Sequence, residues 1–207
     1  MKYIFVAGAP GSKWSSVAKN IYHSEDINHS DKSDDRSYAH QGTYSGQPMH
    51  QGSYFDPGME FGTWFDCIDQ YSKQECEVEF DRPFTGTGIR IIKSHVFCNH
   101  IKFLRETWPE CPVITVLRSN DACLGWWMRC GGFNISYPDY TGYYRNIDVM
   151  VDKIAQQNKN LIAVLNDYSA KTVSNNHQLC QALNIATPLD SYLHNYTIAD
   201  INVRVLN

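Results

Sequence analysis

The chain of 207 residues is long enough for one α/β domain with a hydrophobic core, and a second domain is not expected. With 43% hydrophobic and 19% charged residues, its composition is that of a globular protein and not of a disordered or fibrous one. The formal net charge of −4 argues against wrapping a nucleic-acid backbone, so no nucleic-acid partner is expected. A small anionic ligand is compatible with this charge, because a few local cations and backbone amides can hold it.

The spacing of the cysteines and the length of the apolar runs indicate the cellular compartment of the protein. Seven cysteines are dispersed without a Cys-x-x-Cys pair, which argues against a disulfide framework and favours a reducing compartment. No run approaches the roughly 18 apolar residues of a membrane-spanning helix. The apolar N-terminal stretch passes directly into a loop motif, which indicates a first strand and not a signal peptide. We therefore expect a cytoplasmic protein with no membrane partner, whose oligomeric state the sequence leaves open.

The chain alternates between strand-like and helix-like segments. Short apolar runs rich in β-branched residues predict buried strands at Tyr3–Ala7, Ile89–Lys93, Val113–Leu117 and Leu161–Leu165. Helical spacing is seen at Ser15–Tyr22, Phe61–Tyr71, Ile101–Trp108, Asp121–Arg129, Ile147–Asn158 and Asn175–Leu183. Such alternation predicts βαβ units with right-handed crossovers. The expected fold is α/β, a three-layer P-loop-like domain with a central, mainly parallel sheet flanked by helices.

One segment interrupts this alternation. Residues 24–58 are polar and rich in Ser, Asp, His, Gly, Gln and Tyr. Such a segment is either disordered or a lid that orders over a ligand, and its aromatic residues favour the lid. Its histidines fit no metal-ligand spacing, so no metal site is predicted. We expect a single domain over residues 1–207, with the polar loop or lid at 24–58 inside it.

The first chemical motif joins the first strand to the first helix. It reads Gly8-Ala9-Pro10-Gly11-Ser12-Lys13-Trp14-Ser15-Ser16. A glycine-containing turn before a helix favours anion binding, because unpaired backbone N–H groups and the positive end of the helix dipole converge there. The motif departs from the Walker A pattern, and a plain turn with a helix cap is the alternative interpretation.

The second motif, Lys93-Ser94-His95, ends the second predicted strand. Residues just beyond the carboxyl ends of parallel strands point into the crevice where α/β proteins bind ligands. Two residues that lie two apart on an extended segment share a face, so Lys93 and His95 can reach one ligand. A neutral imidazole can take a proton from an attacking hydroxyl, and a lysine can stabilise negative charge. A structural histidine is the alternative.

The third motif is Val116–Asp121, which again joins a strand to a helix. Arg118 can grip a phosphate through its forked donors. Asn120 or Asp121 is expected to cap the helix that follows.

These three motifs, in this order and at these strand ends, resemble the PAPS-dependent sulfotransferase family. Pro10–Ser15 looks like a variant of the family's Pro-Lys-Ser-Gly-Thr loop. Lys93–His95 matches its Lys-Thr-His segment, and Val113–Arg118 matches its apolar strand that ends in arginine. Leu161–Ser169 looks like the family's later strand, and Leu179–Ile185 resembles its closing helix.

The resemblance implies a sulfotransferase that moves a sulfuryl group from PAPS to an acceptor hydroxyl or amine and releases PAP, with no metal required. It implies that His95 is the general base and that Lys93 and Lys13 neutralise developing charge. Arg118 is assigned to the donor's 3′-phosphate. The donor-binding residues are then Pro10, Gly11, Ser12, Lys13, Trp14, Ser15, Ser16 and Arg118.

Several positions depart from the family's pattern. Lysine and glycine are exchanged within the loop, at Gly11 and Lys13, and a serine of the family falls on Trp126. A C-terminal Arg-Lys-Gly element is missing. These departures keep open a catalytically inactive, nucleotide-binding relative.

A P-loop nucleotide or small-molecule kinase is a further alternative. Leu161–Asp167 resembles a strand that presents a magnesium-holding aspartate. The acceptor is not specified by the sequence, and a small molecule, a sugar or a peptide fits equally well.

Overall fold

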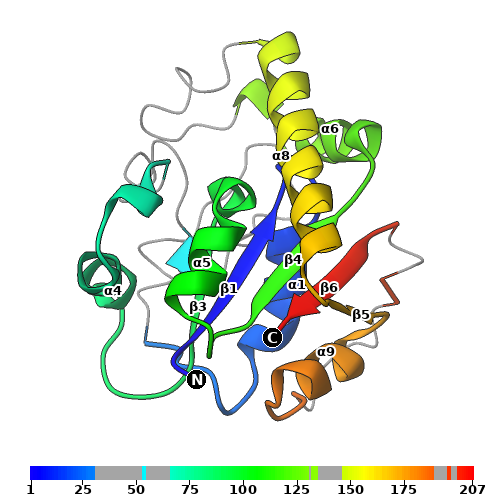
Figure 1. Cartoon of the computed structure of the whole chain (residues 1–207). Helices are drawn as coiled ribbons and strands as arrows, with labels where there is room; N and C mark the ends of the chain where they lie inside the picture. The colour runs from blue at the N-terminus through cyan, green and yellow to red at the C-terminus, as the bar shows by residue number, and fades with distance from the viewer. Residues whose placement is uncertain (31–52, 55–65, 131, 135–145, 189–194, 197–199) are drawn as a thin grey trace.

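The computed structural model describes residues 1–30, 53–54, 66–130, 132–134, 146–188, 195–196 and 200–207. The strands in this part of the chain are β1 (Tyr3–Gly8), β2 (Ser53–Tyr54), β3 (Arg90–Lys93), β4 (Val113–Leu117), β5 (Lys171–Val173) and β6 (Asn202–Leu206). They form one sheet in the order β2-β3-β1-β4-β6-β5 (Figure 1). The first four strands in this order are parallel to one another, whereas β6 runs antiparallel to both β4 and β5. The predicted α/β class with a helix-flanked sheet is confirmed, and the sheet is mixed.

The α-helices in the described residues are α1 (Trp14–Tyr22), α4 (Lys73–Asp81), α5 (Ile101–Thr107), α6 (Asn120–Arg129), α8 (Ile147–Asp167) and α9 (Asn176–Leu183). Short 3₁₀ helices are η2 (Ile68–Gln70), η3 (His95–Asn99) and η4 (Gly132–Asn134). None of the helices in the described residues has both the length and the apolar content needed to cross a bilayer.

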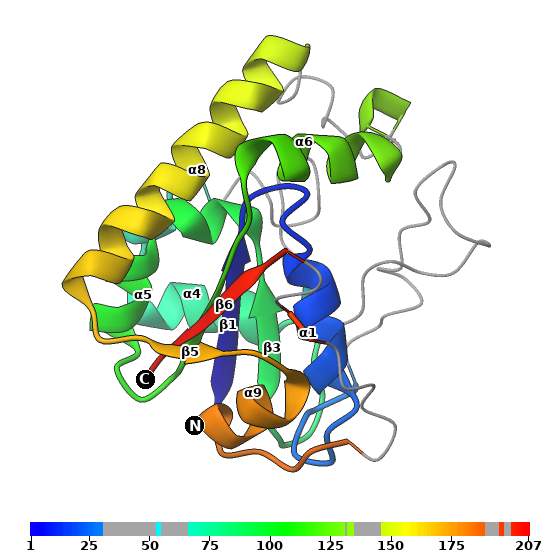
Figure 2. The ribbon, with the colours of Figure 1, turned by 90° about the vertical axis from the view of Figure 1, so that its right-hand side faces the viewer.

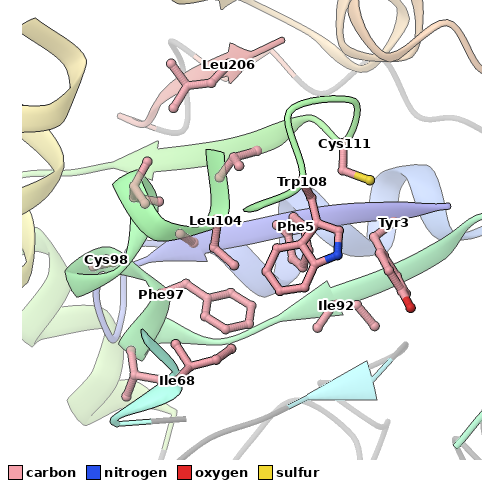
Figure 3. Packing of buried hydrophobic residues seen from close by; sticks show 14 of the residues in the cluster. Tyr3, Phe5, Ile68, Ile92, Phe97, Cys98, Leu104, Trp108, Cys111 and Leu206 are labelled. Atoms are coloured by element: carbon pink, nitrogen blue, oxygen red, sulfur yellow. The ribbon is translucent and has the colours of Figure 1, made fainter. Parts of the chain in front are cut away.

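The hydrophobic core is divided between the two faces of the sheet. Alternate residues of β1 point to opposite faces, as strand geometry requires. Phe5 packs with buried residues of α4, α5 and α8, and its ring centroid lies 5.4 Å from that of Trp108 (Figure 3). Val6 packs on the other face with residues of α1 and α9. Figure 2 shows α8 and α5 on one side of the strands and α1 on the other.

The strand predicted at Leu161–Leu165 is wrong, because these residues lie within the 21-residue helix α8. Leu161 and Leu165 are four residues apart and are both buried against the core, whereas Ile162 between them is 53% exposed. This is helical periodicity. The match of Leu161–Ser169 to a strand of the family is therefore wrong as well. So is the kinase's strand-borne aspartate, since Asp167 is the last residue of α8.

The other predicted elements have mixed outcomes. The predicted strands that lead into the three chemical motifs are confirmed as β1, β3 and β4. Four of the predicted helices correspond to α1, α5, α6 and α9. The prediction at Ile147–Asn158 is confirmed as the first part of α8. The strands β5 and β6 and the helix α4 were not predicted.

Two predictions fall partly outside the described residues. For the helix predicted at 61–71, residues 61–65 lie outside them, and within 66–71 only the short η2 is helical. For the loop or lid at 24–58, residues 31–52 and 55–58 lie outside. Two of its described parts pair with the sheet region: Ile27 bridges to Ile89, and Ser53–Tyr54 forms the edge strand β2 beside β3.

Candidate functional site

The three motifs meet at one edge of the sheet because their strands are neighbours. The strands β3, β1 and β4 lie side by side and are parallel, so their carboxyl ends face the same way (Figure 1). Lys93 pairs with Val6 and Val116 pairs with Gly8, which puts the ends of all three strands at nearly one level. Ligands of α/β proteins bind at this edge. The structure therefore brings the loop of residues 9–13, Lys93 and Arg118 together.

Gly11 fits the loop for two separate reasons. Its φ of 79° lies in the left-handed region, which favours glycine. A Cβ atom at this position would lie 1.9 Å from the carbonyl oxygen of Cys123 in α6. The loop is therefore pressed against the backbone of α6, and a side chain at position 11 would push the two apart. The lysine that the sulfotransferase family has here would not fit this arrangement.

Ser12 places a hydroxyl on the inner side of the loop. The residue is fully buried, and its Oγ has no hydrogen-bond partner among the described residues. A Cβ atom on Gly8 would lie 2.5 Å from this Oγ, so the hydroxyl points back toward the end of β1. A buried hydroxyl without a partner costs about 1–3 kcal/mol, which a bound acceptor oxygen would offset.

Lys13 precedes α1 in a left-handed conformation, with φ 70° and ψ 17°, and its side chain does not cap the helix. Its ammonium lies 4.4 Å from the ring centroid of Trp126, a cation–π contact. Partial burial and the charge of Arg118 lower the pKa of Lys13. The lysine is therefore held near the loop by an uncharged partner.

The remaining predicted loop residues lie around the start of α1. Pro10, Trp14 and Ser15 are buried, and Ser16 is exposed. Trp14 contributes to the core cluster on the α1 face, so this side chain anchors the helix.

Lys93 and His95 both lie at the carboxyl edge of the sheet. They do not share the one extended segment that the sequence predicted. Lys93 is the last residue of β3 and is fully buried. Ser94 is extended and caps η3, because its Oγ accepts a hydrogen bond from the N–H of Val96. His95 is the first residue of η3, so the predicted strand geometry ends at Ser94.

The imidazole of His95 is buried against α8 and is only 1% exposed. Its Nδ1 lies 2.8 Å from Nε2 of the Gln157 side chain. Burial lowers the pKa of His95 to about 3, against the opposing effect of this hydrogen bond. The imidazole is therefore neutral at physiological pH, which is the protonation state that a base requires.

Arg118 ties three elements together from the end of β4. Its Nη1 donates to the carbonyl oxygens of Gly11, at 3.4 Å, and Ala122, at 3.1 Å. Its Nε is buried without a hydrogen-bond partner among the described residues. The helix cap predicted at Asn120 or Asp121 is wrong: Ser119 is the N-cap of α6, and its Oγ accepts from the N–H of Ala122.

A cleft of about 610 Å³ opens beside Arg118, between α8 and the ends of β4, β5 and β6. Its polar lining includes Asn158 of α8, whose amide donates to the carbonyl oxygen of Arg118 and to Oδ1 of Asn120. Asp200, which lies just before β6, lines it as well. Sequence reasoning missed this cleft because it missed the two strands that form one wall.

No group of three or more His, Cys, Asp and Glu residues that could hold a metal occurs in the described part of the chain. No protein-family model, no curated protein and no solved structure matches the chain.

Proposed function

We propose that the chain is a PAPS-dependent sulfotransferase with a P-loop-type, three-layer architecture. The observation that supports this most is the meeting of the anion-binding loop, Lys93 and Arg118 at the carboxyl ends of the neighbouring strands β1, β3 and β4. These are the three places that the resemblance assigns to the donor and to the reaction.

Donor binding uses the loop and the cleft. The 5′-phosphosulfate lies over residues 10–16, where the N-terminus of α1, Lys13 and the Ser12 hydroxyl favour an anion. The 3′-phosphate binds Arg118. The cleft beside Arg118 has the volume of an ordinary ligand site and receives the nucleoside.

In the reaction, the acceptor oxygen or nitrogen bonds to sulfur while the bond from sulfur to the 5′-phosphate oxygen breaks, and PAP leaves. His95 takes the acceptor's proton as general base. Lys93 and Lys13 stabilise the charge on the sulfuryl oxygens and on the departing phosphate. The neutral state of His95 suits this step. Its burial means that the acceptor must reach an imidazole that is enclosed by η3 and α8.

A non-catalytic nucleotide-binding protein is the second candidate. It is favoured by the 1% exposure of His95 and by the engagement of Arg118 with two backbone carbonyls. It differs from the first candidate in one measurable respect, since it binds PAP without transferring a sulfuryl group.

Thermal unfolding with PAP, with AMP, and with ATP plus magnesium tests the proposal. PAP without metal should stabilise the protein by about 2.7 kcal/mol at a hundred times its dissociation constant. AMP, which lacks the 3′-phosphate, should stabilise it less at equal concentration. Stabilisation only by ATP with magnesium would instead identify a kinase.

A further inference from the structure

Asp200 lies at the carboxyl edge of the sheet because β6 runs antiparallel to its neighbours. Leu117 at the end of β4 pairs with Asn202 at the start of β6. The antiparallel strand therefore begins at the edge where the parallel strands end. Arg118 follows Leu117 directly, and Asp200 stands two residues before Asn202. This register places a carboxylate close to the arginine that the proposed function assigns to the 3′-phosphate, and both residues line the cleft of about 610 Å³.

The carboxylate of Asp200 acts on the nearby cations from a distance. Its charge raises the pKa of Lys13, but burial and the charge of Arg118 lower that pKa by more. The guanidinium of Arg118 donates to the carbonyl oxygens of Gly11 and Ala122. The loop side of this edge therefore stays positive, and the cleft adds one negative charge beside it.

A carboxylate in an anion-binding cleft restricts the ligand group that can face it. An ionised carboxylate accepts hydrogen bonds and donates none. It repels a phosphate group at short distance. The ligand group that faces Asp200 must therefore be an uncharged or positive hydrogen-bond donor, such as a hydroxyl or an amino group.

Asn158 adds a second acceptor to the same cleft. Its amide nitrogen donates to the carbonyl oxygen of Arg118 and to Oδ1 of Asn120, which fixes the orientation of the amide. Its Oδ1 is buried without a hydrogen-bond partner among the described residues. The cleft therefore combines a cation for one phosphate with acceptors for donor groups, and a ribonucleotide carries both kinds of group.

We propose that Asp200 is a specificity-determining residue whose carboxylate accepts a hydrogen bond from the 2′-hydroxyl of a bound ribonucleotide. The proposal rests on the proposed function, which assigns the 3′-phosphate to Arg118. The 2′- and 3′-oxygens of ribose are attached to adjacent carbons, so a 3′-phosphate on Arg118 brings the 2′-hydroxyl to the residues beside that arginine. Asp200 then admits a hydroxyl at the 2′ position and excludes a phosphate there.

Calorimetric titration with three nucleotides tests this assignment. The nucleotides are PAP, its 2′-deoxy analogue and adenosine 2′,5′-bisphosphate. The wild type should bind the 2′-deoxy analogue about 5- to 10-fold more weakly than PAP, because one partly exposed hydrogen bond to a charged group is lost. It should bind the 2′,5′-bisphosphate more weakly still, because this ligand sets a phosphate against the carboxylate.

Two substitutions at Asp200 separate the hydrogen bond from the charge. The residue has a left-handed φ of 57°, which glycine adopts freely and asparagine tolerates. Asp200→Gly should bind PAP and the 2′-deoxy analogue equally well, because the partner of the hydroxyl is gone. Asp200→Asn keeps an acceptor and loses the charge, so it should still prefer PAP to the 2′-deoxy analogue but bind the 2′,5′-bisphosphate more tightly than the wild type does.

The matched control is Asp152→Asn, which removes the same charge at an exposed position of α8 and should leave all three affinities unchanged. Equal binding of PAP and its 2′-deoxy analogue by the wild type would overturn the role of Asp200 and leave the proposed function in place. So would an unchanged preference in Asp200→Gly. If the wild type binds none of the three nucleotides, the proposed function fails, and the assignment of Asp200 fails with it.

Discussion

The two edges of the sheet hold their charges in different ways. At the amino edge, the Asp81 carboxylate at the end of α4 accepts hydrogen bonds from Lys2 at 2.7 Å, from the Tyr3 hydroxyl at 2.8 Å, and from Arg90. At the carboxyl edge, the Lys13 ammonium lies over an indole ring, and Arg118 donates to backbone carbonyls.

This difference in charge partners suggests that the amino edge serves stability and the carboxyl edge serves binding. A carboxylate that neutralises nearby cations fixes their positions and leaves little attraction for another anion. Cations that rest on neutral partners keep their charge available, and an incoming anion can displace an indole or carbonyl contact. Substitutions at the amino edge should therefore reduce stability and spare binding, and those at the carboxyl edge should do the reverse.

The largest effect is expected for His95. His95→Asn should lower the rate of the proposed sulfuryl transfer by about 10²–10⁴, because the proposed general base is lost. The affinity for PAP should stay within a factor of about two to three, since the histidine's proposed partner is the acceptor's proton. Transfer assays and calorimetric titration with PAP measure the two quantities. Full activity in this variant would assign His95 to a structural role.

Arg118 should distinguish nucleotides by their 3′-phosphate. Arg118→Ala should weaken PAP binding by roughly 1.5–3 kcal/mol, the range for hydrogen bonds to charged groups, and hardly change AMP binding. Arg118→Lys is the matched variant, because it keeps the charge and loses the forked geometry. Equal losses for PAP and AMP would mean that Arg118 acts only by supporting Gly11 and α6.

At the amino edge, Asp81→Asn should lower the free energy of unfolding by about 1–2 kcal/mol. The value is kept low because 31% of the Asp81 side chain is exposed, and solvent screens its interactions. PAP affinity should not change. Asp152→Asn, at an exposed position of α8, is the control and should change stability by less than about 0.5 kcal/mol.

The Asp81 carboxylate also makes the stability of the fold depend on pH, and the direction of this dependence follows from its pKa. Burial raises the pKa of Asp81, but the hydrogen bonds from Lys2, Tyr3 and Arg90 outweigh it and hold the pKa below its ordinary value of 3.8. The folded state therefore favours the ionised form, and the stabilisation is complete above pH 3.8 and lost as the pH falls through the folded value. Urea titrations at neutral and acid pH measure the free energy of unfolding. Its decrease between the two pH values should be smaller in Asp81→Asn than in the wild type.

The parallel half of the sheet was predictable because its strands are continuous apolar runs that end in chemical motifs. The antiparallel half was not. Lys171–Val173 has two exposed residues and no apolar run. Residues 161–165 form an apolar run of strand length, which periodicity alone does not distinguish from a buried helical segment. The absence of glycine and proline from Ile147 to Asp167 is the signal that favours one long helix.

The sequence predicted which residues lie at the candidate site, but it did not predict the contacts that they make. Strand ends placed the loop, Lys93 and Arg118 together, and a glycine was expected in the turn of the loop. Its close approach is to the backbone of α6, however, over a hundred residues away in sequence. Gln157, which bonds to the ring of His95, lies 62 residues further along the chain. Such contacts depend on tertiary packing, which local sequence patterns do not encode.

The smallest effect concerns the backbone of Lys13, where two substitutions separate side-chain charge from conformation. Both Lys13→Gly and Lys13→Ala remove the ammonium and its contact with Trp126, so both should lose donor affinity. Glycine adopts the left-handed φ of 70° without strain, whereas alanine keeps the steric penalty of about 1–2 kcal/mol. Glycine's greater freedom in the unfolded chain offsets about 0.5–1 kcal/mol of this difference. Lys13→Gly should therefore unfold at a higher urea concentration than Lys13→Ala, by a difference of about 0.5–1 kcal/mol. If alanine were the more stable variant, position 13 would not hold the left-handed conformation, and its correspondence to the glycine of the sulfotransferase loop would lose its physical basis.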